Sequence, residues 1–168
     1  MSRLLIAALL VATTLLAHAD NAVTIQRVID ETVWKPFHDA FEEMDGEALN
    51  ALYADDVLRA TPEGLDTEGA FKRFNATRFD ANRANGDRIE LDFWMDSRRT
   101  NESTSYEVGF YRISIVSPDA TATFHGQFHI VLKSIDGVWQ ITQDWDTDSI
   151  GGRPITAEDF ARQPAIAW

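Results

Sequence analysis

The chain has 168 residues, of which 45% are hydrophobic, and its 27 Asp+Glu against 15 Lys+Arg give a formal net charge of −12 at pH 7. A chain this acidic repels nucleic acid and anionic membrane surfaces, so we expect neither as a partner. It has no cysteine, which excludes disulfides and any zinc site built on thiolates.

Residues 1–19 have the pattern of a secretory signal peptide. Arg3 supplies a short basic region, residues 4–16 are apolar apart from two threonines, and Ala-His-Ala at residues 17–19 is a cleavage signal. The apolar run is too short to span a bilayer. We predict cleavage after Ala19 and a secreted or periplasmic protein without a membrane association; an N-terminal membrane anchor is the alternative.

For the rest of the chain we predict one domain over residues 20–150 and an irregular tail over residues 151–168. The side chain of Trp168 can hold this tail against the domain. Apolar residues from Ile25 to Met44 recur at steps of three and four, as in an amphipathic helix. Pro36 either kinks this helix or starts a second one in its first turn.

Shorter elements follow. They are a helix over residues 47–53, a strand over residues 57–61, a turn at residues 62–64 and a helix that Thr67 caps and that carries Phe79.

From Arg88 the pattern changes to period two, which predicts strands over residues 88–99 and 105–116 and a hairpin over residues 121–146. Asp136-Gly137 between alternating apolar residues is a strong signal for a two-residue hairpin turn. Helices followed by four long strands predict an α+β fold, with the helices packed on one antiparallel sheet.

The hairpin turn also predicts which residues face each other. With Asp136 and Gly137 at its centre, His129 lies opposite Asp144 and Gln127 lies opposite Asp146. One predicted face of the sheet is mixed and carries Tyr106, Val108, Phe110, Arg112, His125, Gln127, His129, Val131, Thr142, Asp144 and Asp146. The other is apolar and aromatic and carries Tyr111, Ile113, Ile115, Phe124, Phe128, Ile130, Leu132, Trp139, Ile141 and Trp145.

Motifs between Val33 and Asp146 resemble the nuclear-transport-factor-2-like superfamily, above all its SnoaL-like and ketosteroid-isomerase-like bacterial members. They are Asp45-Gly46, Ala48-Leu49 and Leu52-Tyr53-Ala54-Asp55-Asp56-Val57, Pro62-Glu63-Gly64, Gly126 and Asp136-Gly137-x-Trp139-x-Ile141. The resemblance implies a cone of helices in a curved sheet, a deep pocket at the wide end, and a homodimer through the outer sheet face. Members of the superfamily include enzymes and binding modules, so the fold does not decide the function.

The isomerase branch has three catalytic groups that can be compared residue by residue. Its tyrosine corresponds to Phe37, which has no hydroxyl, and its general base corresponds to Thr61, which is no base at neutral pH. Its protonated acid corresponds to His129. Because two of the three groups are missing, we do not expect ketosteroid-type isomerisation.

Two arguments disagree about which face lines the pocket. Amphipathicity turns the aromatic face toward the helices, whereas the resemblance turns the mixed face toward the pocket. A pocket is mostly apolar with a few convergent polar groups, and an aromatic outer face would need burial in a dimer. We therefore expect the mixed face to line the pocket.

On that face, His129 and Asp144 are predicted as an acid–base pair, with Arg112 or Tyr106 as donor to an oxyanion. The alternatives are an ordinary cross-strand polar pair, worth ~0.2–1 kcal/mol, or metal ligation by His125, His129 and Asp144 without a helical ligand motif. Predicted ligand-binding residues are Tyr106, Phe110, His125, Gln127, Thr142 and Asp146.

The function predicted is an exported binding or accessory domain for a small apolar or aromatic molecule, with no cofactor and no metal. The alternative is a cofactor-independent isomerase, lyase or hydrolase that uses His129 and Asp144.

Overall fold

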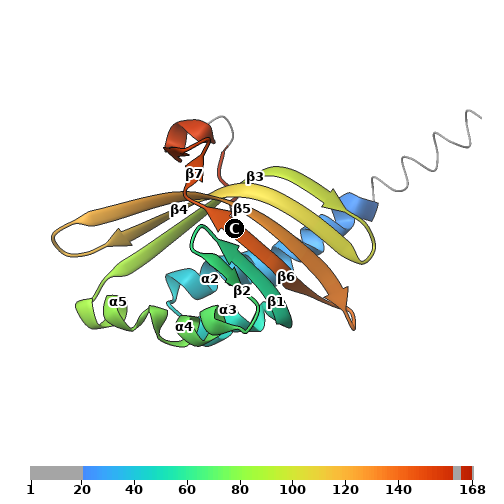
Figure 1. Ribbon diagram of the computed structural model, residues 1–168, viewed down its shortest axis with the longest axis horizontal. Helices are drawn as coiled ribbons and strands as arrows, with labels where there is room; N and C mark the ends of the chain where they lie inside the picture. The colour runs from blue at the N-terminus through green and yellow to red at the C-terminus, as the bar shows by residue number, and fades with distance from the viewer. Residues whose placement is uncertain (1–20, 161–163, 168) are drawn as a thin grey trace, which may run out of the picture.

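The structure is a computed structural model that describes residues 21–160 and 164–167. A six-stranded sheet in the order β2-β1-β6-β5-β4-β3 curves over the helices α2 to α5 (Figure 1). This is the α+β architecture predicted from the sequence. The predicted signal peptide and Trp168 lie outside the described residues, and within them no helix is long and apolar enough to cross a membrane.

The N-terminal helix passes through Pro36 by widening one turn. Residues 21–29 are α-helical, Asp30–Trp34 form a π-turn (η1), and α2 spans Lys35–Glu42. Lys35 N–H donates to the carbonyl of Asp30, five residues back. Since Pro36 has no N–H and its ring crowds the preceding turn, the wider turn accommodates it and α2 begins with proline in its first turn.

Helix α3 spans Gly46–Ala51 and is capped by Asp45, whose Oδ1 accepts from the amides of Glu47 (3.0 Å) and Ala48 (2.9 Å). A Cβ at Gly46 would lie 2.0 Å from the carbonyl oxygen of Asn75, so only glycine allows α3 to approach α4 this closely. The helix predicted over residues 47–53 ends earlier than predicted, at Ala51, because Tyr53 already belongs to β1.

Helices α4 (Ala70–Arg78) and α5 (Asp80–Asn85) follow. The predicted cap at Thr67 is wrong, because Gly69 occupies the N-cap position in the left-handed conformation. The carboxylate of Asp66 instead accepts from the amide of Phe71 at 2.7 Å.

The six strands are β1 (Tyr53–Thr61), β2 (Gly64–Asp66), β3 (Arg88–Thr100), β4 (Thr104–Val116), β5 (Thr121–Ile135) and β6 (Val138–Thr147). Neighbours pair antiparallel except β1 and β6, which are parallel. The sheet is thus mixed, whereas the sequence predicted an antiparallel one.

The helices pack against the aromatic face of the sheet, so the predicted orientation of the two faces is wrong. Phe128, Ile130 and Leu132 of β5 are buried in one core with Trp34 and Phe41. Burial of apolar area is the dominant favourable term in folding, and here it decides the orientation. Other residues of the predicted aromatic face in or against this core are Tyr111, Ile113, Trp139 and Ile141.

The hairpin turn is confirmed, but the register beyond it changes. Asp136 and Gly137 have φ of 51° and 83°, and Ile135 faces Val138. Further along, Leu132 pairs with Ile141 and Val131 pairs with Gln143, so Thr142 is an extra residue in β6. This is a β-bulge, and it exchanges the faces of the residues after it.

The bulge corrects the predicted pairs. His129 pairs with Trp145 instead of Asp144, and Gln127 pairs with Thr147 instead of Asp146. Asp144 and Asp146 move to the inner face, and Trp145 moves to the outer one.

Residues 149–160, which span the end of the predicted domain and the start of the predicted tail, pack on the outer face of the sheet. They form β7 (Ser149–Ile150), β8 (Arg153–Pro154) and a short 3₁₀ turn η2 (Ala157–Asp159), which rise from the side opposite the helices (Figure 1). Ile155 and Phe160 form a second apolar cluster with Phe110 and Trp94. The tail thus covers part of the face on which the homodimer was predicted, and that dimer stays a prediction.

A buried ionic network attaches the N-terminal helix to the sheet. Glu107 is fully buried and accepts from Trp34 Nε1 at 2.7 Å and from Ser105 Oγ at 2.8 Å. Arg98 Nη2 lies 3.0 Å from Glu107 Oε1 and 2.7 Å from Asp30 Oδ1. Breaking a buried pair by removing one partner leaves an uncompensated charge.

We therefore expect Arg98→Met to lower the free energy of unfolding by about 3–5 kcal/mol. Adding Glu107→Gln to that variant should restore part of the loss, because a neutral amide tolerates burial better. Urea denaturation measures both. The control is Arg88→Met, which removes an exposed arginine; if Arg98→Met costs no more than this control, the network does not support the fold.

Candidate functional site

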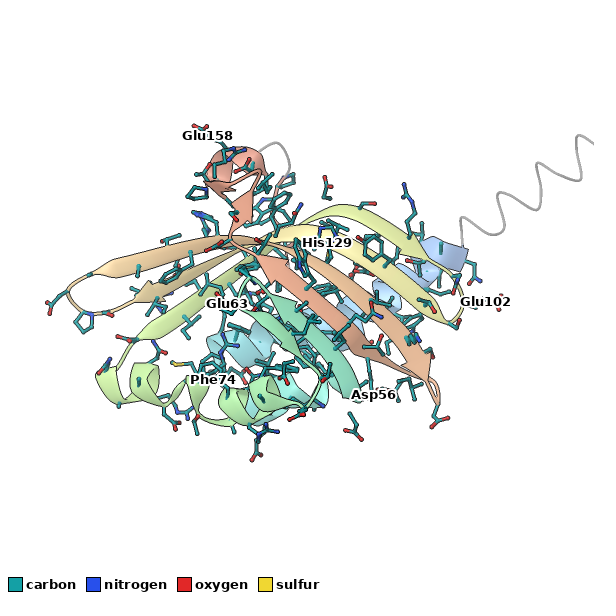
Figure 2. The ribbon with its side chains drawn as sticks, in the orientation of Figure 1. Asp56, Glu63, Phe74, Glu102, His129 and Glu158 are labelled. Atoms are coloured by element: carbon teal, nitrogen blue, oxygen red, sulfur yellow. The ribbon has the colours of Figure 1, made fainter. Side chains whose placement is uncertain are left out.

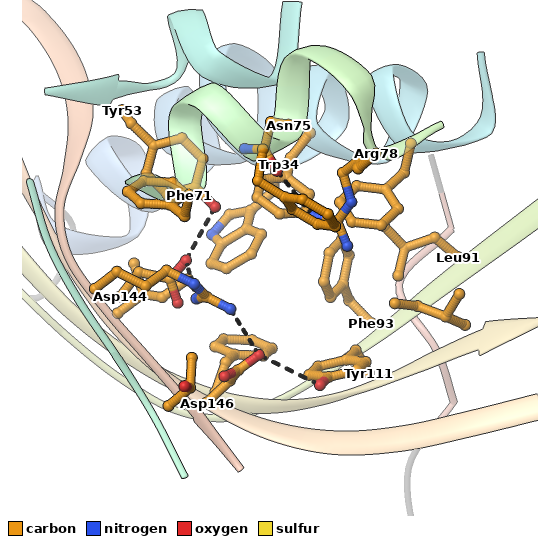
Figure 3. Close-up of a pocket in the computed structure, with 18 residues that line it drawn as sticks. Trp34, Tyr53, Phe71, Asn75, Arg78, Leu91, Phe93, Tyr111, Asp144 and Asp146 are labelled. Carbon is orange, nitrogen blue, oxygen red and sulfur yellow. Dashed lines mark hydrogen bonds and ion pairs between the residues drawn. The ribbon is translucent and has the colours of Figure 1, made fainter. Parts of the chain in front are cut away.

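A cavity of about 310 Å³ lies between the helices and the concave face of the sheet (Figure 3). A volume of this size is at the lower end of the range for small-molecule sites. Its lining residues come from the N-terminal helix, α4 and five strands: Trp34, Phe37, Phe41, Tyr53, Arg59, Thr61, Phe71, Phe74, Asn75, Arg78, Leu91, Phe93, Tyr111, Ile113, Phe128, Ile130, Asp144 and Asp146.

Aromatic rings make up much of the wall. The ring centroid of Trp34 lies 5.1 Å from that of Phe93 and 5.0 Å from that of Phe128. The rings of Phe93 and Phe128 meet edge to face, with their centroids 5.9 Å apart. These tilted and edge-to-face contacts are favourable arrangements for aromatic rings. They produce a rigid apolar wall suited to a flat apolar group.

One part of the wall is strongly polar. Arg59 of β1 reaches two carboxylates of β6, with Nη1 2.6 Å from Asp144 Oδ2 and Nη2 2.9 Å from Asp146 Oδ2. The hydroxyl of Tyr53 donates to Asp144 Oδ2 at 2.9 Å, and that of Tyr111 donates to Asp146 Oδ2 at 3.4 Å. We call these five residues the polar cluster.

The polar cluster follows directly from the sheet. The parallel pairing of β1 with β6 sets Arg59 beside Asp144 in register, and the bulge at Thr142 turns both aspartates inward. Without either feature the guanidinium would have no carboxylate within reach.

Burial governs the protonation of the polar cluster. The side chain of Asp144 is only 5% exposed, and burial raises the pKa of this carboxyl despite the opposing charge of Arg59. Burial and then the negative charge of Asp144 raise the pKa of Tyr53 well above its usual range, and burial and Asp146 do the same for the pKa of Tyr111. Both tyrosines therefore stay neutral donors at physiological pH.

A second cation lines the cavity from α4. The guanidinium of Arg78 lies 4.8 Å from the ring centroid of Phe41 and 5.3 Å from that of Phe79, and its Nη1 donates to Asn75 Oδ1 at 3.0 Å. Burial lowers the pKa of Arg78, although the group stays charged. Asn75 is only 3% exposed and donates to Asn50.

Of the predicted site residues, the cavity contains Asp144 and Asp146. His129 lies on the outer side of the sheet (Figure 2), hydrogen-bonded to the Tyr106 hydroxyl, with its ring 4.7 Å from that of Trp145. The predicted acid–base pair of His129 with Asp144 is therefore not assembled, because the bulge separates the two onto opposite faces.

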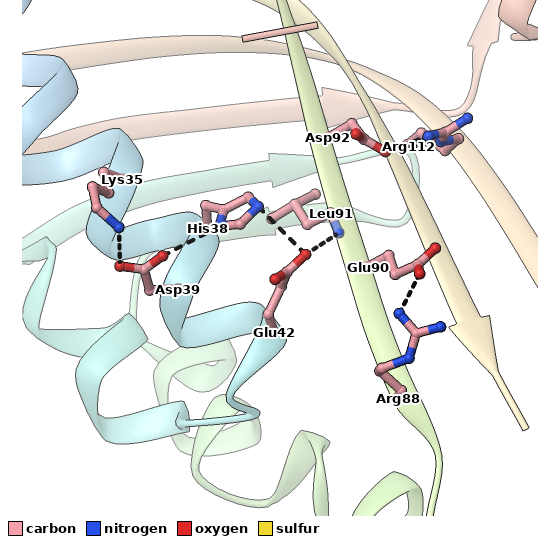
Figure 4. Close-up of polar contacts among 9 residues, drawn as sticks. All are labelled: Lys35, His38, Asp39, Glu42, Arg88, Glu90, Leu91, Asp92 and Arg112. Carbon is pink, nitrogen blue, oxygen red and sulfur yellow. Dashed lines mark hydrogen bonds and ion pairs between the residues drawn. The ribbon is translucent and has the colours of Figure 1, made fainter. Parts of the chain in front are cut away.

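The other predicted residues also lie away from the cavity. Arg112 is bound to Asp92, with Nε at 2.9 Å and Nη2 at 2.6 Å from its Oδ2; Figure 4 shows the two side chains together. Phe110 and His125 contact Phe160 of the tail. The remaining ones are the outer residues Tyr106 and Gln127 and the bulge residue Thr142, whose hydroxyl donates to the carbonyl of Val131.

Sequence reasoning missed both arginines of the cavity, although each had a signal. Phe71, Asn75 and Arg78 are four and three residues apart and thus share one face of a helix. Arg59 alternates with Val57 and Thr61, which places it on one face of a strand. Phe37 and Thr61, which correspond to two groups of the isomerase branch, do line the cavity.

Within residues 21–160 and 164–167, no group of three or more His, Asp or Glu side chains lies close enough to hold a metal ion.

Comparison with known proteins identifies the fold. No family model matches the chain, and no curated protein matches it in sequence. Among solved structures it is similar to a conserved protein from Planctomyces limnophilus, at 19% identity and TM-score 0.59, over 74% of this chain and 96% of that one.

Two further structures carry informative names. One is an NTF-2 like protein of unknown function from Shewanella oneidensis MR-1, at 18% identity and TM-score 0.52, over 68% of this chain and 93% of that one. The other is a ketosteroid isomerase-like protein from Erwinia carotovora, at 14% identity and TM-score 0.54, over 71% and 93%. At such identities the likeness concerns the fold alone, and the fold is the nuclear-transport-factor-2-like cone that the sequence motifs predicted.

Proposed function

We propose that this chain binds a small molecule with a flat apolar part in the cavity between its helices and sheet. The observation that carries the proposal is the cavity itself, about 310 Å³ with a mainly aromatic wall and a few convergent polar groups. That combination is typical of small-molecule sites. One solved protein with this fold is described as ketosteroid isomerase-like, a name that refers to small-molecule chemistry.

Binding is favoured over catalysis by the state of the polar cluster. Arg59 forms ion pairs with Oδ2 of Asp144 and with Oδ2 of Asp146. The Tyr53 hydroxyl also donates a hydrogen bond to Asp144 Oδ2. Groups held in this way orient a ligand, and protonation of either carboxylate would weaken its ion pair with Arg59.

A second function, proton transfer to or from the ligand, is favoured by one observation. Asp144 is a buried carboxyl whose raised pKa brings it closer to neutral pH, and such shifts are common in acid–base catalysts. In this case Asp144 would act without the predicted partner His129, and Tyr53 would hold its orientation.

We also propose that the protein is exported. The support is the sequence pattern of residues 1–19, which precedes the first described helix.

Filling the cavity should abolish binding. A thermal-shift screen of arenes and other flat apolar compounds should find ligands that raise the unfolding midpoint. At a ligand concentration a hundredfold above Kd, binding stabilises the folded state by about 2.7 kcal/mol. Thr61→Trp places a large ring at the cavity wall and should remove the shift, whereas Thr121→Trp, the same change at an exposed position of β5, should keep it.

His129→Ala should bind with unchanged affinity, because the imidazole lies outside the cavity. If no compound shifts the midpoint, or if Thr61→Trp binds as well as the unmodified chain, the binding proposal is wrong.

The pKa of Asp144 has a measurable consequence for stability. The unfolded carboxyl titrates near pH ~3.9, and the folded one titrates higher. Between the two values the folded state binds more protons than the unfolded state, so the stability contributed by this group falls as pH rises through that window.

Urea denaturation from about pH 4 to pH 7 should therefore show the stability of the unmodified chain falling relative to Asp144→Asn as pH rises. Titrating groups that do not interact with Asp144 cancel in this difference. A rise instead would mean that the ion pair with Arg59 outweighs burial, which would remove the argument for acid–base catalysis.

Export can be tested by expressing the full chain in a bacterial host and analysing the periplasm and medium by mass spectrometry. The exported protein should begin at Asp20. Full-length protein in the membrane fraction would instead support the N-terminal anchor.

A further inference from the structure

Arg78 stands apart from the other cavity cation in how its charge is compensated. Arg59 is held between two carboxylates, at 2.6 Å and 2.9 Å. For Arg78, no ion pair with a carboxylate exists among residues 21–160 and 164–167, and its polar contact there is the neutral side chain of Asn75. A guanidinium presents several N–H donors in a planar fork, and a single contact leaves most of them without a protein partner.

The position of Arg78 is nevertheless fixed. Its guanidinium lies within 4.8–5.7 Å of the ring centroids of Phe41, Phe79 and Phe74, and Asn75 is itself held by Asn50 at 2.9 Å. Figure 3 shows the side chain reaching from α4 toward the interior of the cavity. Such a group is preorganised, so a ligand that binds it does not have to order a flexible side chain.

The electrostatics of the cavity favour an anion at this place. A charged guanidinium among aromatic rings has lost much of its hydration, and its attraction for an anion is stronger in these surroundings than in water. A carboxylate can accept two parallel N–H bonds from it.

The polar cluster limits the charge that the ligand can carry. Asp144 and Asp146 share one arginine, so the cluster has at most one uncompensated negative charge. That charge would repel a second negative group on the ligand. A monoanion such as a carboxylate therefore fits better than a phosphate dianion.

We propose that the ligand is a small aromatic or flat apolar monoanion of the carboxylate class, whose charged group binds Arg78 and whose ring lies against Phe93 and Phe128. This rests on the proposed function, because it names the ligand class of the same cavity. An arene with a substituent fits in size, since a cavity of about 150 Å³ already holds benzene and this one measures about 310 Å³.

The test compares three probes with the same ring isomer: naphthoate, its neutral amide naphthamide, and the cationic naphthylmethylamine. Calorimetric titration of the mature chain should give at least roughly tenfold tighter binding of naphthoate than of naphthamide, as expected for charge-assisted hydrogen bonds. Arg78→Gln should remove this preference while naphthamide affinity stays the same. Arg73→Gln removes an exposed arginine from the same helix and should leave the preference intact.

Arg78→Lys keeps the charge but not the planar fork, so it should keep a reduced preference and serves as a second variant if Arg78→Gln does not fold. Equal binding of naphthoate and naphthamide would overturn the anion inference and leave the binding proposal standing, and so would a preference for the amine. Anion preference that persists in Arg78→Gln would also overturn it. Binding of none of the three probes would overturn this ligand class, and the proposed function itself falls if the wider thermal-shift screen also finds no ligand.

Discussion

The candidate site depends on one extra residue in β6. Ile141 faces the core, and regular alternation would place Gln143 and Trp145 on the same side. Because Thr142 is bulged, Asp144 and Asp146 take that side instead. Two carboxylates thus enter an aromatic interior, a costly arrangement unless a cation compensates them. The parallel neighbour β1 supplies this cation as Arg59. Bulge and parallel pairing are therefore both needed for the polar cluster.

The same structure has two buried ionic sites of different character. Where the N-terminal helix meets the sheet, Glu107 is paired with Arg98 and accepts hydrogen bonds from Trp34 and Ser105, and neither Glu107 nor Arg98 lines the cavity. The polar cluster is satisfied to a similar degree, but it borders an open volume. Comparable chemistry therefore attaches the helix to the sheet in one place and borders the cavity in the other.

The long strands could be predicted from the sequence because their alternation is regular. The structure extends the predicted strand over residues 88–99 to Thr100, begins the next one at Thr104, and has the turn at Asp136-Gly137. The bulge could not be predicted, because Thr142 continues the alternation of apolar and polar residues without a break. Every pairing between β5 and β6 beyond it was therefore displaced by one residue, including that of His129 with Asp144.

The predicted face of the pocket failed for a different reason. The mixed face contains more polar groups, but the aromatic face contains the area whose burial stabilises the fold, and the helices cover the latter. The inner-face site residues have local sequence patterns, but those patterns do not show which residues meet. That depends on the packing of the elements. Arg59 needed the pairing of β1 with β6, and Arg78 needed the packing of α4 over the sheet.

The arrangement of the polar cluster also bears on what the cavity can do. A general base must be able to receive a proton, but protonating Asp144 would weaken its ion pair with Arg59 and leave Asp146 as the main partner of that arginine. Proton transfer would thus redistribute charge inside a site of low dielectric constant, which costs free energy unless the ligand compensates it. Binding requires no such change, because Arg78 and the aromatic wall are already in place. For this reason the geometry supports recognition of a ligand more directly than its chemical conversion.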